Sequence, residues 1–123
     1  MSDSLQRMIE KQRGLQALIA PKIYAFGEAG GCDGQVFFLK ENGNALAHEA
    51  SEVVDALPWK MHKADFGRPL TQAEREHAIE ETVDCLHFVL NLFLDLGVRT
   101  SGEIEGRFFG KNDINHDRWT NGY

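Results

Sequence analysis

The sequence is poor in cysteine, with only Cys32 and Cys85 among its 123 residues. Two cysteines are too few for a disulfide scaffold and are typical of a protein in a reducing compartment. No segment approaches the roughly 20 apolar residues that a membrane-spanning helix needs. The first residues also lack the apolar region of a signal peptide. We therefore expect a cytoplasmic protein without a membrane partner.

Positive charge is also scarce. The sequence has 13 lysines and arginines against 19 acidic residues, which gives a net charge of −6. Proteins that bind DNA or RNA neutralise phosphates with such cations, so we expect no nucleic-acid partner. The composition, 42% hydrophobic and 26% charged, predicts one globular domain over residues 1–123. A domain of this size buries only about 65% of its unfolded surface, which makes a partner subunit natural.

The apolar pattern is helical almost throughout, and the one β-like stretch, residues 35–39, runs into a helical pattern. The sequence therefore predicts an all-α bundle of four to five helices. Residues 27–34 and 58–70 are predicted to be connections. The predicted helices are Ser4–Ala20, with Ser4 as N-cap and Pro21 ending it, Asp33–Leu57, Thr71–Asp95, and a fourth from a Thr100–Glu103 capping box past Phe109.

The third predicted helix has the clearest signals. Thr71 and Glu74 form a capping box, and Gly97 follows the predicted end. Residues 85–96 are apolar nearly all round, which indicates burial on several sides. Because four helices in one small chain cover only part of such a segment, we expect a homodimer, or a tetramer.

Two pairs of acids are spaced three residues apart: Glu49 with Glu52, and Glu81 with Asp84. Residues at this spacing project from one helix face on neighbouring turns. Both pairs lie within apolar stripes, so packing of the stripes would draw four anions together. A hard divalent cation such as Mg²⁺ relieves the resulting repulsion through oxygen ligands. The alternative is that each pair is a solvated helix face, and spacing alone leaves both interpretations open.

The E-x-x-E and E-x-x-D motifs resemble those of the all-α NTP pyrophosphatase superfamily, which includes MazG-like proteins and dimeric dUTPases. Residues 83–91, V-D-C-L-H-F-V-L-N, are similar to the V-D-x-x-H-F-x-L segment of dimeric dUTPases and of the dCTP/dUTP pyrophosphatases of T-even phages. Residues 111–123 resemble their K-N-x-x-N-x-x-R-Q-x-x-G-Y tail, although Trp119 replaces the glutamine. Residues 8–16 resemble the first helix of the family.

This resemblance implies an enzyme that hydrolyses dUTP or dCTP to the monophosphate and pyrophosphate. It implies that the four acids Glu49, Glu52, Glu81 and Asp84 bind Mg²⁺, for which Mn²⁺ can substitute. A bound cation reverses the local field, which explains how an acidic protein accepts an anionic nucleotide. Glu49, favoured narrowly over Glu52, is expected to orient or deprotonate the attacking water.

The resemblance also implies residues that hold the nucleotide. The expected phosphate-binding residues are Lys111, Asn115, Arg118, Tyr123 and Lys60; the alternative for this polar tail is a frayed C-terminus, and we expect it to be mobile until substrate orders it. The expected base and sugar contacts are Gln12, Trp59, His87, Phe88 and Asn91. His87 could instead be a packing residue, and Trp59 a half-buried aromatic at a helix end.

Three functions therefore remain open. The first is a pyrimidine deoxynucleotide pyrophosphatase, in which the choice between dUTP and dCTP is undecided because an amide side chain can serve either base. The second is a MazG-like pyrophosphatase of broad specificity, and the third a catalytically silent helical dimerisation module.

The twofold partner is expected to pack its own third helix alongside and to bring Gln12 or Trp59 to each nucleotide site.

Overall fold

The computed structural model describes residues 3–122, and these contain four helices and no strand. The helices are α1 (Ser4–Ala29), α2 (Gly34–Asp55), α3 (Gln72–Asp95) and α4 (Ser101–Thr120). The predicted all-α class is confirmed, and the β-like stretch at residues 35–39 is the first part of α2. No helix in this range is long and apolar enough to cross a membrane.

The first helix is longer than predicted, because α1 continues past Pro21 to Ala29. A proline inside a helix costs roughly 3 kcal/mol, so packing must offset the loss. The turns after Pro21 supply that packing. Tyr24 packs edge-to-face on Phe38 with ring centroids 5.7 Å apart, and Gly27 lies so close to Phe37 that an added Cβ would be 2.5 Å from its ring. The predicted connection at residues 27–34 shrinks accordingly to residues 30–33.

Helix ends agree with the sequence where a cap was well specified. The Thr71–Glu74 capping box is present at the start of α3, and Gly97 after its end has a φ of 86°. The predicted N-cap of α1 was wrong by one residue, since the carboxylate of Asp3 accepts from the backbone N–H of Gln6 at 3.0 Å. At α4, Thr100 caps the backbone N–H of Glu103.

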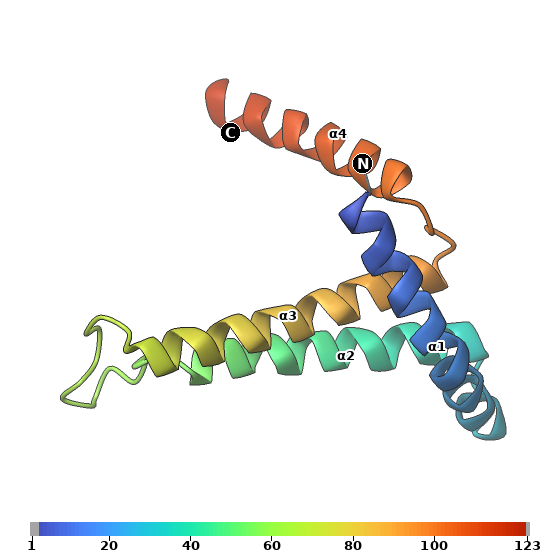
Figure 1. The fold of residues 1–123 in the computed structure, drawn as a ribbon, viewed down its shortest axis with the longest axis horizontal. Coiled ribbons are helices and arrows are strands. Elements are labelled where there is room, and N and C mark those ends of the chain that lie inside the picture. The colour runs from blue at the N-terminus through green and yellow to red at the C-terminus, as the bar shows by residue number, and fades with distance from the viewer. Residues whose placement is uncertain (1–2, 123) are drawn as a thin grey trace.

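The helices form an open arrangement (Figure 1). The antiparallel pair α2 and α3 is the main body, and α1 crosses it near the C-terminal half of α3. Among the described residues the start of α4 lies against α1, and the rest of α4 extends away from α2 and α3. The polar tail predicted to follow the fourth helix belongs to α4, which is a continuous helix to Thr120.

The core is small and lies at the crossing of α1 with α3. Ile9, Leu90 and Leu94 are buried there, and Leu5 and Ile104 pack against them. The solvent-accessible surface is 8905 Å², whereas a folded monomer of 13.9 kDa is expected to expose about 6,700 Å². The chain therefore leaves apolar surface that its own helices do not cover.

Candidate metal centre

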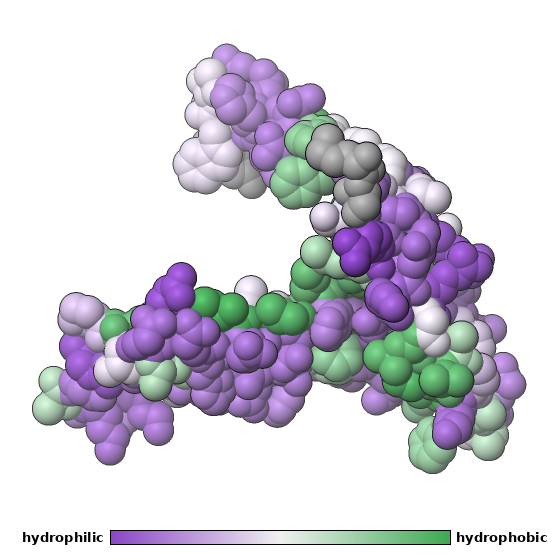
Figure 2. Space-filling model, viewed as in Figure 1, coloured by the Kyte–Doolittle hydropathy of each residue, from purple (hydrophilic) through white to green (hydrophobic). Residues whose placement is uncertain are grey.

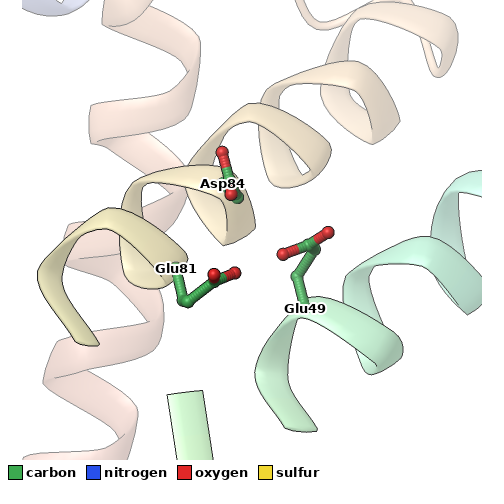
Figure 3. Close-up of side chains that lie close together, drawn as sticks. All are labelled: Glu49, Glu81 and Asp84. Carbon is green, nitrogen blue, oxygen red and sulfur yellow. The ribbon is translucent and has the colours of Figure 1, made fainter. Parts of the chain in front are cut away.

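Three carboxylates meet where α2 and α3 run side by side (Figure 3). Glu49 comes from α2, and Glu81 and Asp84 come from neighbouring turns of α3. One carboxylate oxygen from each lies within 4.8 Å of the other two, and all three side chains are partly buried. The packing of α2 on α3 therefore brings three of the four predicted acids together, whereas Ile79, Val83 and Leu86, the apolar residues of α3 expected to pack there, are exposed.

The electrostatics of this cluster show that the acids are crowded. The pKa of Glu49 is raised, first by a hydrogen bond with Glu81, then by burial and by the negative charges of Glu81 and Asp84. His48 acts in the opposite direction. A hydrogen bond between two carboxyl groups requires a shared proton, and a divalent cation can take the place of that proton. An all-oxygen donor set of three carboxylates fits a hard cation.

Glu52, the fourth predicted ligand, is not part of this close group. Its carboxylate pairs with Nε2 of His48 at 3.2 Å, one turn earlier on α2. The same arrangement recurs on α3, where Nε2 of His77 lies 3.1 Å from Glu81. Both histidines precede their glutamate by four residues, and this spacing was the signal that could have identified them from the sequence.

Two helical turns from the acids, three buried carboxamides form a chain of hydrogen bonds. Gln12 Nε2 donates to Asn91 Oδ1 at 2.6 Å, and Asn91 Nδ2 donates to Asn42 Oδ1 at 3.0 Å. Asn42 Nδ2 then donates to the carbonyl oxygen of Phe38 at 2.9 Å. The predicted base-contacting residues Gln12 and Asn91 are thus bonded to each other, and Asn42 is a member that the sequence analysis missed.

The other predicted nucleotide contacts lie at separate places. His87 lines a groove of about 690 Å³ between α1 and α3, together with Gln12 and Val83. Phe88 is half-buried. Trp59 is 45% exposed in the connection after α2, and the ammonium of Lys60 lies 5.9 Å from its ring centroid.

The predicted phosphate-binding residues Lys111, Asn115 and Arg118 all lie on α4 and are exposed. Since this part of α4 extends away from α2 and α3 (Figure 1), the chain in this conformation does not bring them to the acidic cluster. They do share one helix face with Ile104, which packs on the core, and with Phe108. Tyr123 lies outside the described residues.

A protein-family model described as dUTPase matches residues 4–102, which include both acidic motifs and helices α1 to α3. The chain belongs to the dUTPase family. It is also 29% identical to the dCTP pyrophosphatase of Enterobacteria phage T4 over 149 aligned positions, which cover 98% of this chain and 83% of the phage protein. No solved structure matches the chain.

Membership of the dUTPase family confirms the resemblance drawn from the sequence motifs. It also confirms the prediction of a nucleoside triphosphate pyrophosphohydrolase over that of a catalytically silent module. The matched segment ends near the start of α4, whereas the similarity to the phage protein extends over nearly the whole chain.

Proposed function

We propose that this member of the dUTPase family hydrolyses a pyrimidine deoxynucleoside triphosphate, dCTP or dUTP, to the monophosphate and pyrophosphate. The main support for the proposal is that the carboxylates of Glu49, Glu81 and Asp84 lie close together within the segment that matches the family. The relative from phage T4 is named a dCTP pyrophosphatase, which supports a pyrimidine substrate.

The proposed cofactor is Mg²⁺, with Mn²⁺ as a substitute. Glu49, Glu81 and Asp84 would hold it, and Glu52 would join them on release from His48. A divalent ion supplies Lewis-acid charge that neutralises the oxygens of a bound triphosphate. Glu49 faces the two α3 acids from the opposite helix, whereas Glu52 is engaged by His48, so we assign orientation and deprotonation of the attacking water to Glu49.

The proposed phosphate contacts on α4 are Lys111, Asn115 and Arg118. They follow Ile104 at seven, eleven and fourteen residues, which keeps them near the face of the helix that carries Ile104. Arg107 lies near the same face and pairs with Glu103 at 3.2 Å. Asp113 and Asp117 lie on the opposite face. A guanidinium can hold two phosphate oxygens, and an ammonium acts as a point charge. Lys60 and Tyr123 are assigned to the same task.

A substrate panel tests the activity. The protein with Mg²⁺ is given the deoxy- and ribonucleoside triphosphates in turn, and released pyrophosphate is measured. We expect dCTP or dUTP to be cleaved roughly 100-fold faster than dATP or GTP, because a site that hydrogen-bonds one base leaves its polar groups unpaired with another. Comparable rates on all nucleotides would indicate the broad MazG-like specificity instead.

We also propose a homodimer, or a tetramer, in the cytoplasm. Along α3 an apolar stripe of Ile79, Val83 and Leu86 is 39–43% exposed, and Figure 2 shows hydrophobic surface on this part of the body, facing the hollow beneath α4. A second α3 packed alongside would bury this stripe, and because Val83 and Leu86 also line the groove between α1 and α3, the partner would form one wall of that groove. Gln12 is bonded within its own chain, so Trp59 is the residue available to the partner's site. Sedimentation should show dimers, and Leu86→Glu should yield monomers.

A further inference from the structure

The chain of carboxamides at the crossing of α1, α2 and α3 has a fixed direction. Its anchor is the backbone carbonyl of Phe38, which can only accept a hydrogen bond. Asn42 must therefore turn Nδ2 toward this carbonyl, which leaves its Oδ1 to accept from Asn91. Asn91 in turn presents its own Oδ1 to the amide nitrogen of Gln12. One backbone atom thus decides the orientation of three side chains.

All three carboxamides are buried, which strengthens this constraint. Gln12, Asn42 and Asn91 are exposed by 7%, 5% and 4%. Rotation of one amide by 180° would set donor against donor or acceptor against acceptor inside the protein. An unpaired buried polar group is costly, so a reversed amide is disfavoured by both of its neighbours.

The Gln12 end of the carboxamide chain lies at the groove between α1 and α3. Gln12 belongs to the carboxamide chain and also lines the groove of about 690 Å³ between α1 and α3. This volume lies within the range of small-molecule sites. His87 lines the same groove and is one helical turn from Asp84 of the acidic cluster. A nucleotide base placed in this groove would meet the Gln12 carboxamide.

We propose that Asn42 is a positioning residue that sets which pyrimidine the enzyme accepts, by fixing the direction of the Gln12 carboxamide. The inference rests on the proposed function and adds a residue to it. Cytosine has a donating amino group beside an accepting ring nitrogen, whereas uracil has an accepting carbonyl beside a donating N–H. A carboxamide that rotates freely serves both bases, and one held in a single direction matches one of them better.

Two substitutions at the same position separate this role from a purely structural one. Asn42→Leu removes the acceptor for Asn91, so that Asn91 and Gln12 are both released to rotate. Asn42→Asp keeps that acceptor, and therefore keeps the direction of the chain. Both variants disturb the buried contact with Phe38, so a structural role would lower the stability of both and change substrate preference in neither.

The measurement is kcat/KM for dCTP and for dUTP, together with thermal unfolding, on the full chain with Mg²⁺. We expect the wild type to prefer one pyrimidine by at least about tenfold, and expect Asn42→Asp to keep that preference. In Asn42→Leu the ratio of kcat/KM for the preferred pyrimidine to kcat/KM for the other should fall toward one. If Asn42→Leu fails to fold, Asn42→Ala, which removes the same acceptor, takes its place in the comparison.

Several results would overturn the proposal. A wild type that cleaves both pyrimidines equally, or an Asn42→Leu variant with the wild-type ratio, rejects the role of Asn42 and leaves the proposed activity standing. An Asn42→Asp variant that loses the preference also rejects it, because the direction of the chain is then irrelevant. A wild type that cleaves neither dCTP nor dUTP refutes the proposed function itself.

Discussion

The acidic cluster and the carboxamide chain are two polar groups that lie two turns apart between α2 and α3, and Gln12 of α1 completes the second. Glu49 and Asn42 are seven residues apart on α2, and Asp84 and Asn91 are seven apart on α3. The carboxamides donate to and accept from each other in one continuous chain. The carboxylates can only accept when ionised, so they satisfy each other only by sharing a proton, and the pKa of Glu49 is raised.

Because of this difference, the acidic cluster and the carboxamide chain are suited to different tasks. A polar group that is saturated by its own chain holds helices in place and fixes the orientation of side chains at its ends. A group of anions that is not saturated has room for a cation from outside, which takes the place of the proton that the carboxylates share. The acids are therefore suited to a metal, and the amides to recognition.

The largest expected effect follows from removing one acid. Glu49→Gln should lower turnover of dCTP and dUTP roughly 100-fold or more, since outer contacts of metal sites alone are worth 10–100-fold. Asp84→Asn should do the same, and circular dichroism should show an unchanged helical content. Asp55→Asn, an exposed acid at the end of α2, is the control and should keep its activity. Full turnover in excess chelator would remove the metal assignment.

The next effect concerns α4, which neither polar group contacts in this chain. Arg118→Ala should raise KM for the nucleotide roughly 10- to 100-fold, because a charge-assisted hydrogen bond contributes about 1.5–3 kcal/mol. Steady-state kinetics measure the change. Asp113→Asn changes one charge on the opposite face of the same helix and should leave KM alone. An unchanged KM in Arg118→Ala would mean that Arg118 of α4 does not bind the phosphates.

The comparison also predicts opposite effects on stability in metal-free protein. Asn91→Leu leaves Gln12 and Asn42 buried without their partner, so the free energy of unfolding should fall by about 2–5 kcal/mol. Glu49→Gln removes a charge from a crowded cluster and should raise the melting temperature slightly. Thermal unfolding in the presence of a chelator measures both effects. A loss of stability in Glu49→Gln would mean that the acids do not repel each other.

The smallest effect lies at the start of α3, away from both groups. There the Arg68 guanidinium, the backbone N–H of Thr71 and the Thr71 hydroxyl lower the pKa of Glu74 to about 2. A lowered pKa contributes stability above the ordinary value of 4.5, and this contribution is lost as the pH falls from 4.5 through 2. Arg68→Ala should make unfolding less dependent on pH in that window. An identical pH dependence would show that the ion pair contributes nothing.

Most of the secondary structure could be predicted from the sequence because it depends on local signals. The capping box at Thr71 and the apolar periodicity of α3 specify a helix without reference to other elements. The prediction was wrong at Pro21 because local chemistry favours a helix end there, whereas the packing of Tyr24 and Gly27 against α2 favours continuation. The length of α4 was missed for a similar reason, since Ile104 near its start packs on residues distant in the chain.

The sequence alone determined the fold class, the family and the faces on which the acids lie, because residues three apart on one helix must share a face whatever surrounds it. Only the tertiary structure decided which of them meet. The rotation of α2 against α3 places Glu49 beside Glu81 and Asp84 and leaves Glu52 with His48. The same rotation brings Asn42 within hydrogen-bonding distance of Asn91. Helix periodicity specifies directions within one helix, and the relative rotation of two helices depends on how all of their side chains pack.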